Sequence, residues 1–130
     1  MKDCFYRIST KALIKDEMGR VLLIREGDMW ELPGGGLEHG EIPQDALVRE
    51  IYEEMGLEVI AVSEAPAYIT TSLHRKGEYW IANIIYEVQV KDLNFVSSSE
   101  CEEIHFFTKE EALLEKLFPN VKAFLDVYKA

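Results

Sequence analysis

Hydrophobic residues recur at short intervals near the start of the chain, in the pattern expected of β-strands. The segment from Phe5 to Lys15 alternates loosely, with apolar positions at Ile8, Ala12, Leu13 and Ile14. The turn residues Asp16–Gly19 follow, and then the apolar run VLLIR at 21–25. Two strands joined by a short turn ordinarily pair with each other, so this pattern predicts a β-hairpin.

The spacing of apolar residues changes to a helical period between Pro43 and Met55. The apolar face consists of Leu47, Val48, Ile51, Tyr52 and Met55. Pro43 suits the first position of a helix, and Gly56 suits the left-handed residue just past its end. Ile42 stands where Ser or Thr would cap the helix, so the cap is about 1 kcal/mol weaker than it could be. The pattern predicts an amphipathic helix over 43–55.

After this helix, β-rich segments alternate with polar loops. Residues 58–71 predict a strand that is broken or bent near Pro66. The run YWIANIIYEVQV at 79–90 is β-branched and aromatic enough for the central strand of a sheet. The other predicted elements are loops at 73–78 and 94–103, a short strand at 104–107, and helices at 109–116 and 119–128. This order predicts an α/β fold in which helices pack on the faces of a mixed β-sheet.

The length and composition fit one globular domain. The chain has 130 residues, 48% hydrophobic and 29% charged, so residues 1–130 are expected to form a single domain. The N-terminal sequence MKDCFYRIST has charges where a signal peptide needs an apolar run, and no apolar stretch is long enough for a membrane span. A cytoplasmic location, without a membrane partner, is expected. Cys4 and Cys101 lack a metal-binding spacing and are interpreted as ordinary thiols.

The net charge limits the kinds of partner. Asp and Glu number 24 and Lys and Arg 14, which gives a formal net charge of −10. Proteins that bind long DNA or RNA draw affinity from Lys and Arg on phosphates, so long nucleic acid is disfavoured. A small phosphorylated ligand is compatible with this charge, because a metal ion can bridge acidic side chains to phosphate oxygens. A homodimer is left open.

Three glutamates distinguish the predicted helix from an ordinary one. Glu50, Glu53 and Glu54 fall within an arc of roughly 100°. Each like-charged pair costs about 0.2–0.5 kcal/mol, and Arg49 is the nearby compensating charge. The cluster is either a solvated acidic face or a site for a divalent cation, which prefers oxygen ligands. Before the helix, residues 33–36 (PGGG) predict a loop whose backbone comes close to a ligand.

The glycines and glutamates together resemble the Nudix box. That motif reads Gly, five residues, Glu, seven residues, Arg-Glu, an aliphatic residue, any residue, Glu-Glu, any residue, Gly and an aliphatic residue. The matching residues are Gly35, Glu41, Arg49, Glu50, Ile51, Glu53, Glu54, Gly56 and Leu57. The resemblance implies an α/β/α sandwich with a mixed β-sheet. It also implies Mg²⁺- or Mn²⁺-dependent hydrolysis of a small nucleotide: a nucleotide sugar, an ADP-ribose-like compound or a nucleoside triphosphate.

The resemblance further implies roles for individual residues. Glu53 and Glu54 match the paired glutamates that hold the metal, and Glu50 matches a third ligand or base. Gly35 matches a glycine whose carbonyl joins the metal shell. Arg49 is counted with the catalytic residues, although its role is chiefly to hold the loop and the helix together through the first glutamate of the box.

One more glutamate is expected from the loop at 94–103. Many members of the family place a metal ligand or general base on this loop, and Glu100 is preferred over Glu102 and Glu103 for that role. An acidic helix cap or a solvated turn is the alternative interpretation.

Several other residues keep two interpretations. His39 is either a surface residue or a ligand and is left unassigned, while His74 and Arg75 either touch a substrate phosphate or belong to a solvated loop. The aromatic residues that either stack on a base or simply fill the core are Phe5, Tyr6, Tyr68 and Trp80.

Three functions are compatible with the sequence. They are a metal-dependent pyrophosphohydrolase, a catalytically silent nucleotide-sensing module, and an interaction domain whose acidic face meets a basic protein. The intact set of box glutamates favours the enzyme.

Overall fold

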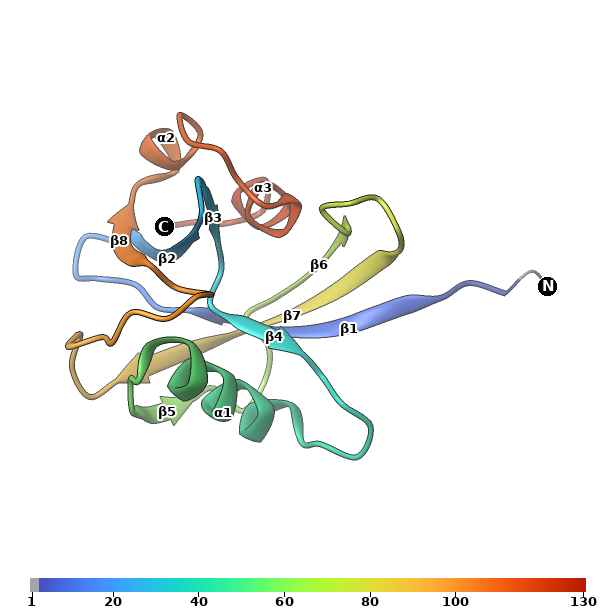
Figure 1. The fold of residues 1–130 in the computed structure, drawn as a ribbon, viewed down its shortest axis with the longest axis horizontal. Coiled ribbons are helices and arrows are strands. Elements are labelled where there is room, and N and C mark those ends of the chain that lie inside the picture. The colour runs from blue at the N-terminus through green and yellow to red at the C-terminus, as the bar shows by residue number, and fades with distance from the viewer. Residues whose placement is uncertain (1–2) are drawn as a thin grey trace.

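The computed structural model describes residues 3–130, which form a larger and a smaller β-sheet with helices packed on them (Figure 1). The elements in chain order are β1 (Tyr6–Leu13), β2 (Val21–Glu26), β3 (Met29–Glu31), β4 (Gly34–Gly36), α1 (Pro43–Met55), β5 (Val59–Val62), β6 (Tyr68–Leu73), β7 (Trp80–Val90), β8 (Glu103–Phe107), α2 (Lys109–Ala112) and α3 (Pro119–Leu125). No helix in this described part is long and apolar enough to cross a lipid bilayer.

β7 is the centre of the larger sheet, as its apolar sequence predicted. β1 runs parallel to one edge of β7, with Tyr6 beside Trp80. β5 and β6 both pair antiparallel with the other edge. β4 pairs antiparallel with β1 and forms the outer strand on that side. The sheet is therefore mixed, which confirms the expected fold class.

Residues 58–71 form two strands, so the predicted break near Pro66 is confirmed. β5 pairs near the end of β7, with Val62 opposite Val88, and β6 pairs near its start, with Leu73 opposite Trp80. Between them the chain leaves the sheet, and Pro66 lies in this connection. A proline has no N–H to give to a ladder, so the break occurs where the sequence placed it.

The predicted hairpin of β1 and β2 is wrong, because these strands lie in different sheets. The turn between them is tight: the Asp16 carboxylate accepts hydrogen bonds from the N–H groups of Met18 and Arg20 at 3.0 and 2.9 Å. Beyond a single bridge between Lys15 and Val21, however, the strands diverge. Both edges of β1 are occupied by β4 and β7, so β2 instead joins β3 and β8 in the smaller sheet.

The three glycines form a strand where a loop was predicted. Gly36 pairs with Ser9 of β1 and Gly34 with Lys11. Gly34 has a φ of 130°, and a Cβ there would overlap the main-chain oxygen of Thr10. A residue with a side chain could not bring β4 this close to β1.

α1 has the bounds that the sequence predicted. Gly56 follows it with a φ of 67° and donates its N–H to the Tyr52 oxygen at 2.8 Å, while Ile42 provides no side-chain cap. The later helices are shorter than predicted, since α2 ends at Ala112 and α3 at Leu125. Leu114, just past α2, is 87% exposed, so no buried apolar face extends that helix.

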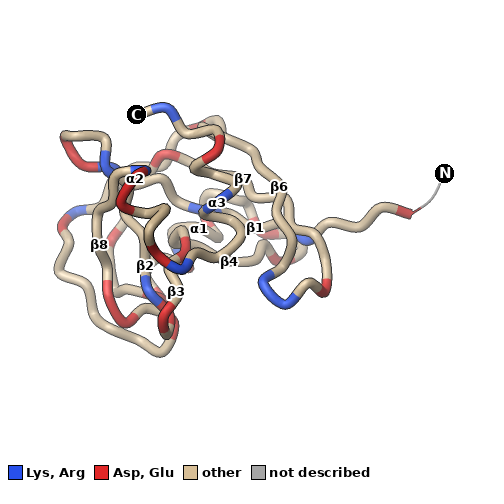
Figure 2. Tube along the Cα trace, turned by 90° about the horizontal axis from the view of Figure 1, so that it is seen from above, with Lys and Arg blue, Asp and Glu red and all other residues tan. Residues whose placement is uncertain are grey.

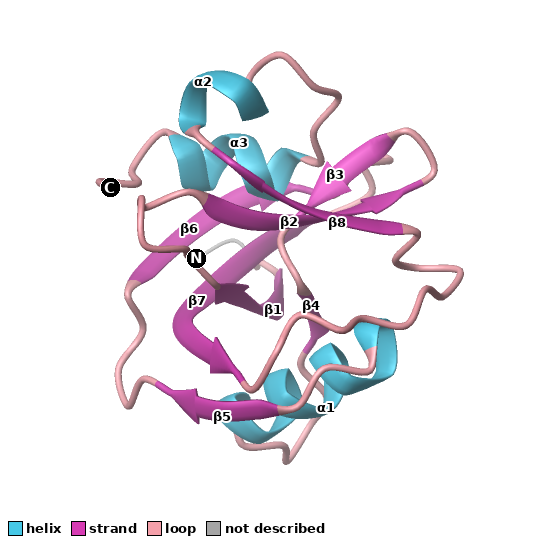
Figure 3. Ribbon diagram, turned by 90° about the vertical axis from the view of Figure 1, so that its left-hand side faces the viewer, coloured by secondary structure: helices cyan, strands magenta, loops and turns pink. Residues whose placement is uncertain are grey.

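Helices cover both faces of the larger sheet (Figure 3). On one face α1 packs in a core cluster that includes Ala12, Leu47, Ile51, Met55, Tyr86 and Val88. On the other face α3 and the smaller sheet pack in a second cluster that includes Leu13, Trp30, Ile85, Val121 and Phe124. α1 contacts β4, β1 and β5. It does not cover the end of this sheet face where β1 and β7 begin and β6 ends, and Tyr6, Trp80 and Leu73 are exposed there.

Candidate functional site

The acidic face of α1 lies against the glycine strand β4. Glu54 is 3% exposed and accepts a hydrogen bond from the Gly34 N–H at 2.9 Å. Glu50 lies against Gly35, where a Cβ would come within 2.7 Å of the glutamate's carboxylate carbon. Glu53 remains at the rim, with 57% of its side chain exposed. The fold thus brings two of the three glutamates directly to the glycine strand.

Arg49 joins these glutamates to the loop that precedes α1. Its Nε and Nη2 donate to the Glu41 carboxylate at 3.0–3.2 Å. Its Nη1 lies 3.2 Å from carboxylate oxygens of both Glu50 and Glu53. The predicted reach from Arg49 to Glu53 and its link to Glu41 are confirmed. One guanidinium therefore offsets part of the repulsion along the helix.

The two carboxylates at the strand lie in an environment that disfavours their charged forms. Burial raises the pKa of Glu54 to about 8; the positive charge of Lys11 opposes this increase, and the charge of Glu31 adds to it. Burial also raises the pKa of Glu50, and Arg49 opposes that increase. A buried carboxylate of this kind gains a favourable partner when a cation binds.

The Gly35 carbonyl takes part in the sheet ladder. The main-chain hydrogen bonds that flank it run from the Ala12 N–H to the Pro33 oxygen and from the Leu37 N–H to the Ile8 oxygen, both at 2.9 Å. Because bonded pairs alternate along an antiparallel ladder, Gly35 faces Thr10, whereas Gly34 and Gly36 turn their main-chain groups outward. A carbonyl has two lone pairs, so the Gly35 oxygen keeps one for a ligand.

Lys11 is a candidate residue that the sequence analysis missed. Its side chain is 7% exposed, and its Nζ donates to the carbonyl oxygens of Leu32 and Gly34, both at 3.2 Å. A Glu31 carboxylate oxygen lies 3.5 Å from the same nitrogen. The sequence signal was the position of this lysine directly before the apolar run Ala12–Ile14 of a predicted strand, since lysine is almost never buried without partners.

In the loop before β8, Glu100 differs from Glu102 and Glu103 in its contacts. Glu102 and Glu103 both pair with Arg25 of β2, at 3.0 and 3.1 Å. Glu100 is exposed, and its charge adds to the increase that burial causes in the pKa of Glu50. Of the three, Glu100 is thus the one whose charge acts on the pKa of Glu50 in α1.

The same loop is fastened to the C-terminal end of α1. The Val96 N–H donates to the Met55 oxygen at 2.7 Å. The Ser98 hydroxyl donates to the Glu54 main-chain oxygen at 2.8 Å and accepts the Glu100 N–H at 3.3 Å. These contacts hold the base of the loop next to the acidic face.

The glutamates match a hard divalent cation in their chemistry. The side-chain donors from α1 are all carboxylate oxygens, and β4 beside them has no side chains to obstruct a cation. Among residues 3–130 no three His, Cys, Asp or Glu side chains already converge as a metal site. Arg49 pairs with both Glu50 and Glu53, and the exposed side chain of Glu53 has room to change rotamer when a cation replaces this pairing. The donor set fits, and the side chains must close around the ion.

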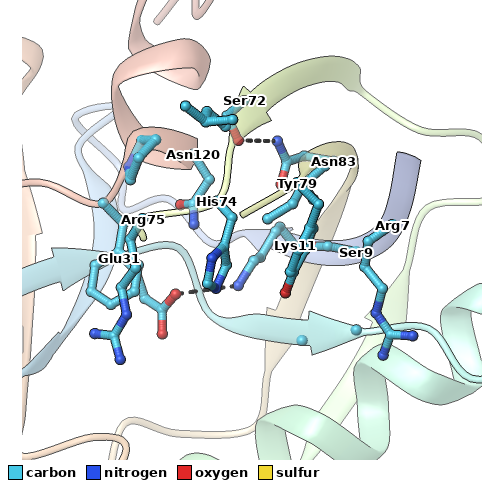
Figure 4. Close-up of a pocket in the computed structure, with 16 residues that line it drawn as sticks. Arg7, Ser9, Lys11, Glu31, Ser72, His74, Arg75, Tyr79, Asn83 and Asn120 are labelled. Carbon is cyan, nitrogen blue, oxygen red and sulfur yellow. Dashed lines mark hydrogen bonds and ion pairs between the residues drawn. The ribbon is translucent and has the colours of Figure 1, made fainter. Parts of the chain in front are cut away.

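A cavity of about 250 Å³ opens on the other face of the larger sheet, beside β4 (Figure 4). Its charged lining residues are Arg7, Lys11, Arg75 and Glu31. Acidic residues are spread over most of the chain, whereas Lys and Arg mark the turn between β6 and β7 beside the cavity (Figure 2). In a chain of net charge −10, three cations facing one carboxylate make this cavity suited to an anionic ligand.

The turn between β6 and β7 forms one wall of the cavity. His74 stacks on Tyr79 with ring centroids 4.4 Å apart, and the Arg75 guanidinium lies 5.0 Å from the centre of the Phe118 ring. All four residues line the cavity. His74 and Arg75 therefore lie at the cavity, as contact with a substrate phosphate would require.

The aromatic residues proposed to stack on a base lie elsewhere. Tyr68 packs edge-on against Phe124 at 5.7 Å and belongs with the core around α3. Phe5, Tyr6 and Trp80 are 42–72% exposed, and the cavity lining includes none of them. The aromatic side chains at the cavity are Tyr79 and Phe118, which sequence reasoning did not single out.

Comparison with known proteins gives a consistent result. A family model described as "NUDIX domain" matches residues 5–128. A MutT-like protein from Streptomyces ambofaciens is 43% identical over 56 residues, which cover 42% of this chain and 36% of that protein. An RNA pyrophosphohydrolase from Vibrio atlanticus (strain LGP32) is 29% identical over 105 residues, which cover 77% of this chain and 60% of that protein.

The crystal structure of a MutT protein from Methanosarcina mazei Go1 has a TM-score of 0.72 to this chain at 25% identity. The match covers 97% of this chain and 92% of that one. The fold is thus shared over almost the whole length. The match to the two curated relatives spans between 36% and 60% of their length.

Proposed function

This chain belongs to the Nudix family, and from that premise we propose that it is a hydrolase that cleaves the diphosphate linkage of a nucleoside diphosphate joined to another moiety. The position of β4 carries the proposal. Glu50 and Glu54 meet this strand from one side, and the cavity with Arg7 and Lys11 opens on the other. A phosphate chain along β4 would meet no side chain of the strand itself.

We propose Mg²⁺ as the cofactor, with Mn²⁺ as its substitute. The oxygens that would hold it come from Glu50, Glu53, Glu54, Glu100 and the Gly35 carbonyl. When bound, such a cation polarises phosphoryl oxygens and lowers the pKa of a bound water. The protein orients the carboxylates through Arg49 and keeps a proton acceptor, Glu50 or Glu100, beside the phosphate.

The size of the cavity limits what enters it. At about 250 Å³ it is smaller than the roughly 300 Å³ at which pockets for whole drug-sized ligands begin. It suits one part of a nucleotide, and its lining residues Arg7 and Lys11 suit the phosphates where the cavity borders β4. The net charge of −10 favours a small nucleotide over a long RNA. An RNA with a 5′-triphosphate is still a competing substrate, because one relative is an RNA pyrophosphohydrolase.

The first prediction is metal-dependent turnover of a small nucleotide. We expect the protein to release phosphate or pyrophosphate from at least one member of a panel of nucleoside triphosphates, ADP-ribose and UDP-glucose with millimolar Mg²⁺. EDTA should abolish the release. Mg²⁺ should also raise the melting temperature, because a ligand of the native state stabilises it by mass action.

Two other results would point away from this activity. Thermal stabilisation by nucleotide and Mg²⁺ without any product would favour the catalytically silent sensing module. An unchanged melting curve with metal and nucleotide, again without product, would favour an acidic interaction domain. Hydrolysis restricted to a triphosphorylated RNA would move the substrate to the class of the RNA pyrophosphohydrolase.

We also propose that the protein works in the cytoplasm. Its two cysteines are free, Cys4 at the surface and Cys101 buried. Free exposed thiols are typical of a reducing compartment.

The uncovered end of the sheet face that carries α1 is proposed as a homodimer interface. The side chains exposed there are Tyr6 and Ile8 of β1, Ile69 and Leu73 of β6, and Trp80 of β7, with exposed fractions of 39–68%. They form a patch on the order of 400 Å², a size that often marks a function on a monomer. None of the five is charged, which suits a second copy of the same acidic chain better than a basic partner.

The second prediction tests this interface by light scattering after size-exclusion chromatography. The protein should elute as a dimer at about 100 μM, and Trp80→Glu should convert it to a monomer, because burying an unpaired charge opposes association. Leu114→Glu is the matched control, since Leu114 is 87% exposed at α2, and it should remain dimeric. A wild-type protein that is monomeric at this concentration would refute the interface.

A further inference from the structure

At the edge of the cavity, the guanidinium of Arg7 lies where a side chain at Gly36 would otherwise be. Ser9 pairs with Gly36, so Arg7, two residues earlier on β1, lies diagonally across from the glycine on the same face of the sheet. A Cβ at Gly36 would overlap Arg7 Nη2 and lie 3.1 Å from its Cζ and Nε. Because Gly36 has no side chain, the guanidinium can occupy this position.

Arg7 is also held more loosely than the other cations of the site. Its one recorded polar contact among the described residues is with Glu38, at 3.4 Å, and both side chains are substantially exposed. Lys11, by contrast, donates to two carbonyl oxygens, and Arg75 lies over Phe118. A guanidinium has five N–H donors, so Arg7 keeps most of its hydrogen-bonding capacity for a ligand.

Arg7 lies next to β4, the strand along which the phosphates of the substrate are proposed to lie. Figure 4 shows Arg7 on the side of the cavity opposite Arg75 and Glu31, next to β4. Glu50 touches β4 at the next residue, Gly35, from the other face. The two main-chain groups of Gly36 turn outward between them. An anion that lies along β4 thus has Glu50 on one side and the loosely held guanidinium of Arg7 on the other.

We propose that Arg7 binds a terminal phosphate of the substrate and so selects compounds whose phosphate chain has a free end over diphosphates capped by a sugar. This proposal rests on the proposed function. A terminal phosphate offers three acceptor oxygens, which suit the paired N–H groups of a guanidinium. The half-exposed position of Arg7 places it at the solvent end of the chain, where a sugar cap would offer no charge.

The third prediction is a double-substitution test of Arg7 and Gly36. With the nucleoside triphosphates as probes, Arg7→Met should lower kcat/KM by at least about tenfold, mainly through KM, since the substrate loses a charge-assisted hydrogen bond. ADP-ribose and UDP-glucose should change by less than twofold. Gly36→Ala should reproduce this pattern, because its methyl group takes the place of the guanidinium, and the double variant should be no worse than Arg7→Met alone.

Lys15→Met serves as the matched control. It removes a half-exposed cation, paired with the single carboxylate of Glu87, two residues past the other end of β1, and it should leave all rates unchanged. Melting temperatures of the variants identify any loss of folding. Equal losses on capped and uncapped substrates, additive effects of the two substitutions, or a wild-type preference for capped diphosphates would each overturn the role of Arg7. Failure of the proposed function looks different, because the wild-type protein would then turn over none of the probes.

Discussion

Glu54→Gln should lower kcat by about a thousandfold or more while the protein remains folded. The carboxylate is proposed to help hold the cation, whose charge stabilisation contributes several kcal/mol, and each 1.36 kcal/mol corresponds to tenfold in rate. Glutamine has nearly the same shape and keeps an oxygen for the Gly34 N–H, which donates at 2.9 Å. Steady-state kinetics at saturating substrate and Mg²⁺ would measure the loss.

Glu58→Gln provides the matched control. Glu58 is an exposed glutamate three residues past α1, and it pairs with Lys91 at 3.8 Å. Its replacement by glutamine also removes one negative charge, but at a position that is not next to β4. Its kcat should stay within about twofold of wild type, as for most surface substitutions. Wild-type turnover in Glu54→Gln would refute the metal assignment.

The same substitution has a pH-dependent effect on stability. The pKa of Glu54 is raised by burial from 4.5 to about 8, so the folded state binds its proton more tightly than the unfolded state does. The contribution of Glu54 to the stability of the wild-type protein therefore decreases as the pH rises from about 4.5 to 8. Glutamine does not titrate, so with EDTA the variant should be more stable than wild type at pH 8.5, by about 1 kcal/mol or more, and nearly equal at pH 4. Urea unfolding at both pH values measures this, and a variant that is less stable at pH 8.5 would contradict the burial of a charged Glu54.

Glu100→Gln offers an informative comparison with Glu54→Gln. As a base or late ligand on a loop, Glu100 should affect kcat by at least about tenfold but Mg²⁺ affinity less than Glu54 does. Glu103→Gln should be mild, because Glu103 pairs with Arg25 on β2. A crippling Glu103→Gln beside a neutral Glu100→Gln would transfer the role to Glu103.

Gly34→Ala should destabilise the fold by more than about 4 kcal/mol, or prevent folding altogether, because the new methyl group would overlap the Thr10 main-chain oxygen. Neither strand can retreat cheaply, since β1 is also paired along its whole length with β7. The midpoint of urea unfolding, or the soluble yield if the variant does not fold, measures the effect.

Gly40→Ala separates this overlap from backbone strain. Gly40 also has a positive φ, 84°, but a Cβ there would meet nothing within 4 Å. Its replacement should cost about 1–2 kcal/mol, the strain of the left-handed region alone. Equal stability of the two variants would mean that β4 can move away from β1.

The parts of the fold governed by local rules were predictable from the sequence. The bounds of α1 follow from Pro43 at its start, Gly56 past its end and the helical spacing between them, and the structure has the same bounds. The central position of β7 follows from its length and its β-branched residues. Within the site, the reach of Arg49 to Glu53 depends only on helical spacing, which is why the sequence predicted it.

The parts that depend on distant partners were not predictable. Whether β1 pairs with β2 depends on which strands already occupy its edges, and these come from residues 34–36 and 80–87. Three glycines favour a loop by propensity, and they form a strand only because β1 requires a neighbour without side chains. The environment of Lys11 likewise arises from main-chain oxygens more than 20 residues away.

The fastening of the loop at Val96 and Ser98 bears on how relatives of this protein can change in length. Residues 91–95 lie upstream of both hydrogen bonds to α1, so extra residues there can bulge outward without moving Glu100. An insertion between Ser98 and Glu100 would carry the glutamate away from the acidic face. The loop therefore has one portion in which length is free to drift and another in which it is fixed by geometry, and only the first is open to the gain of a new binding segment.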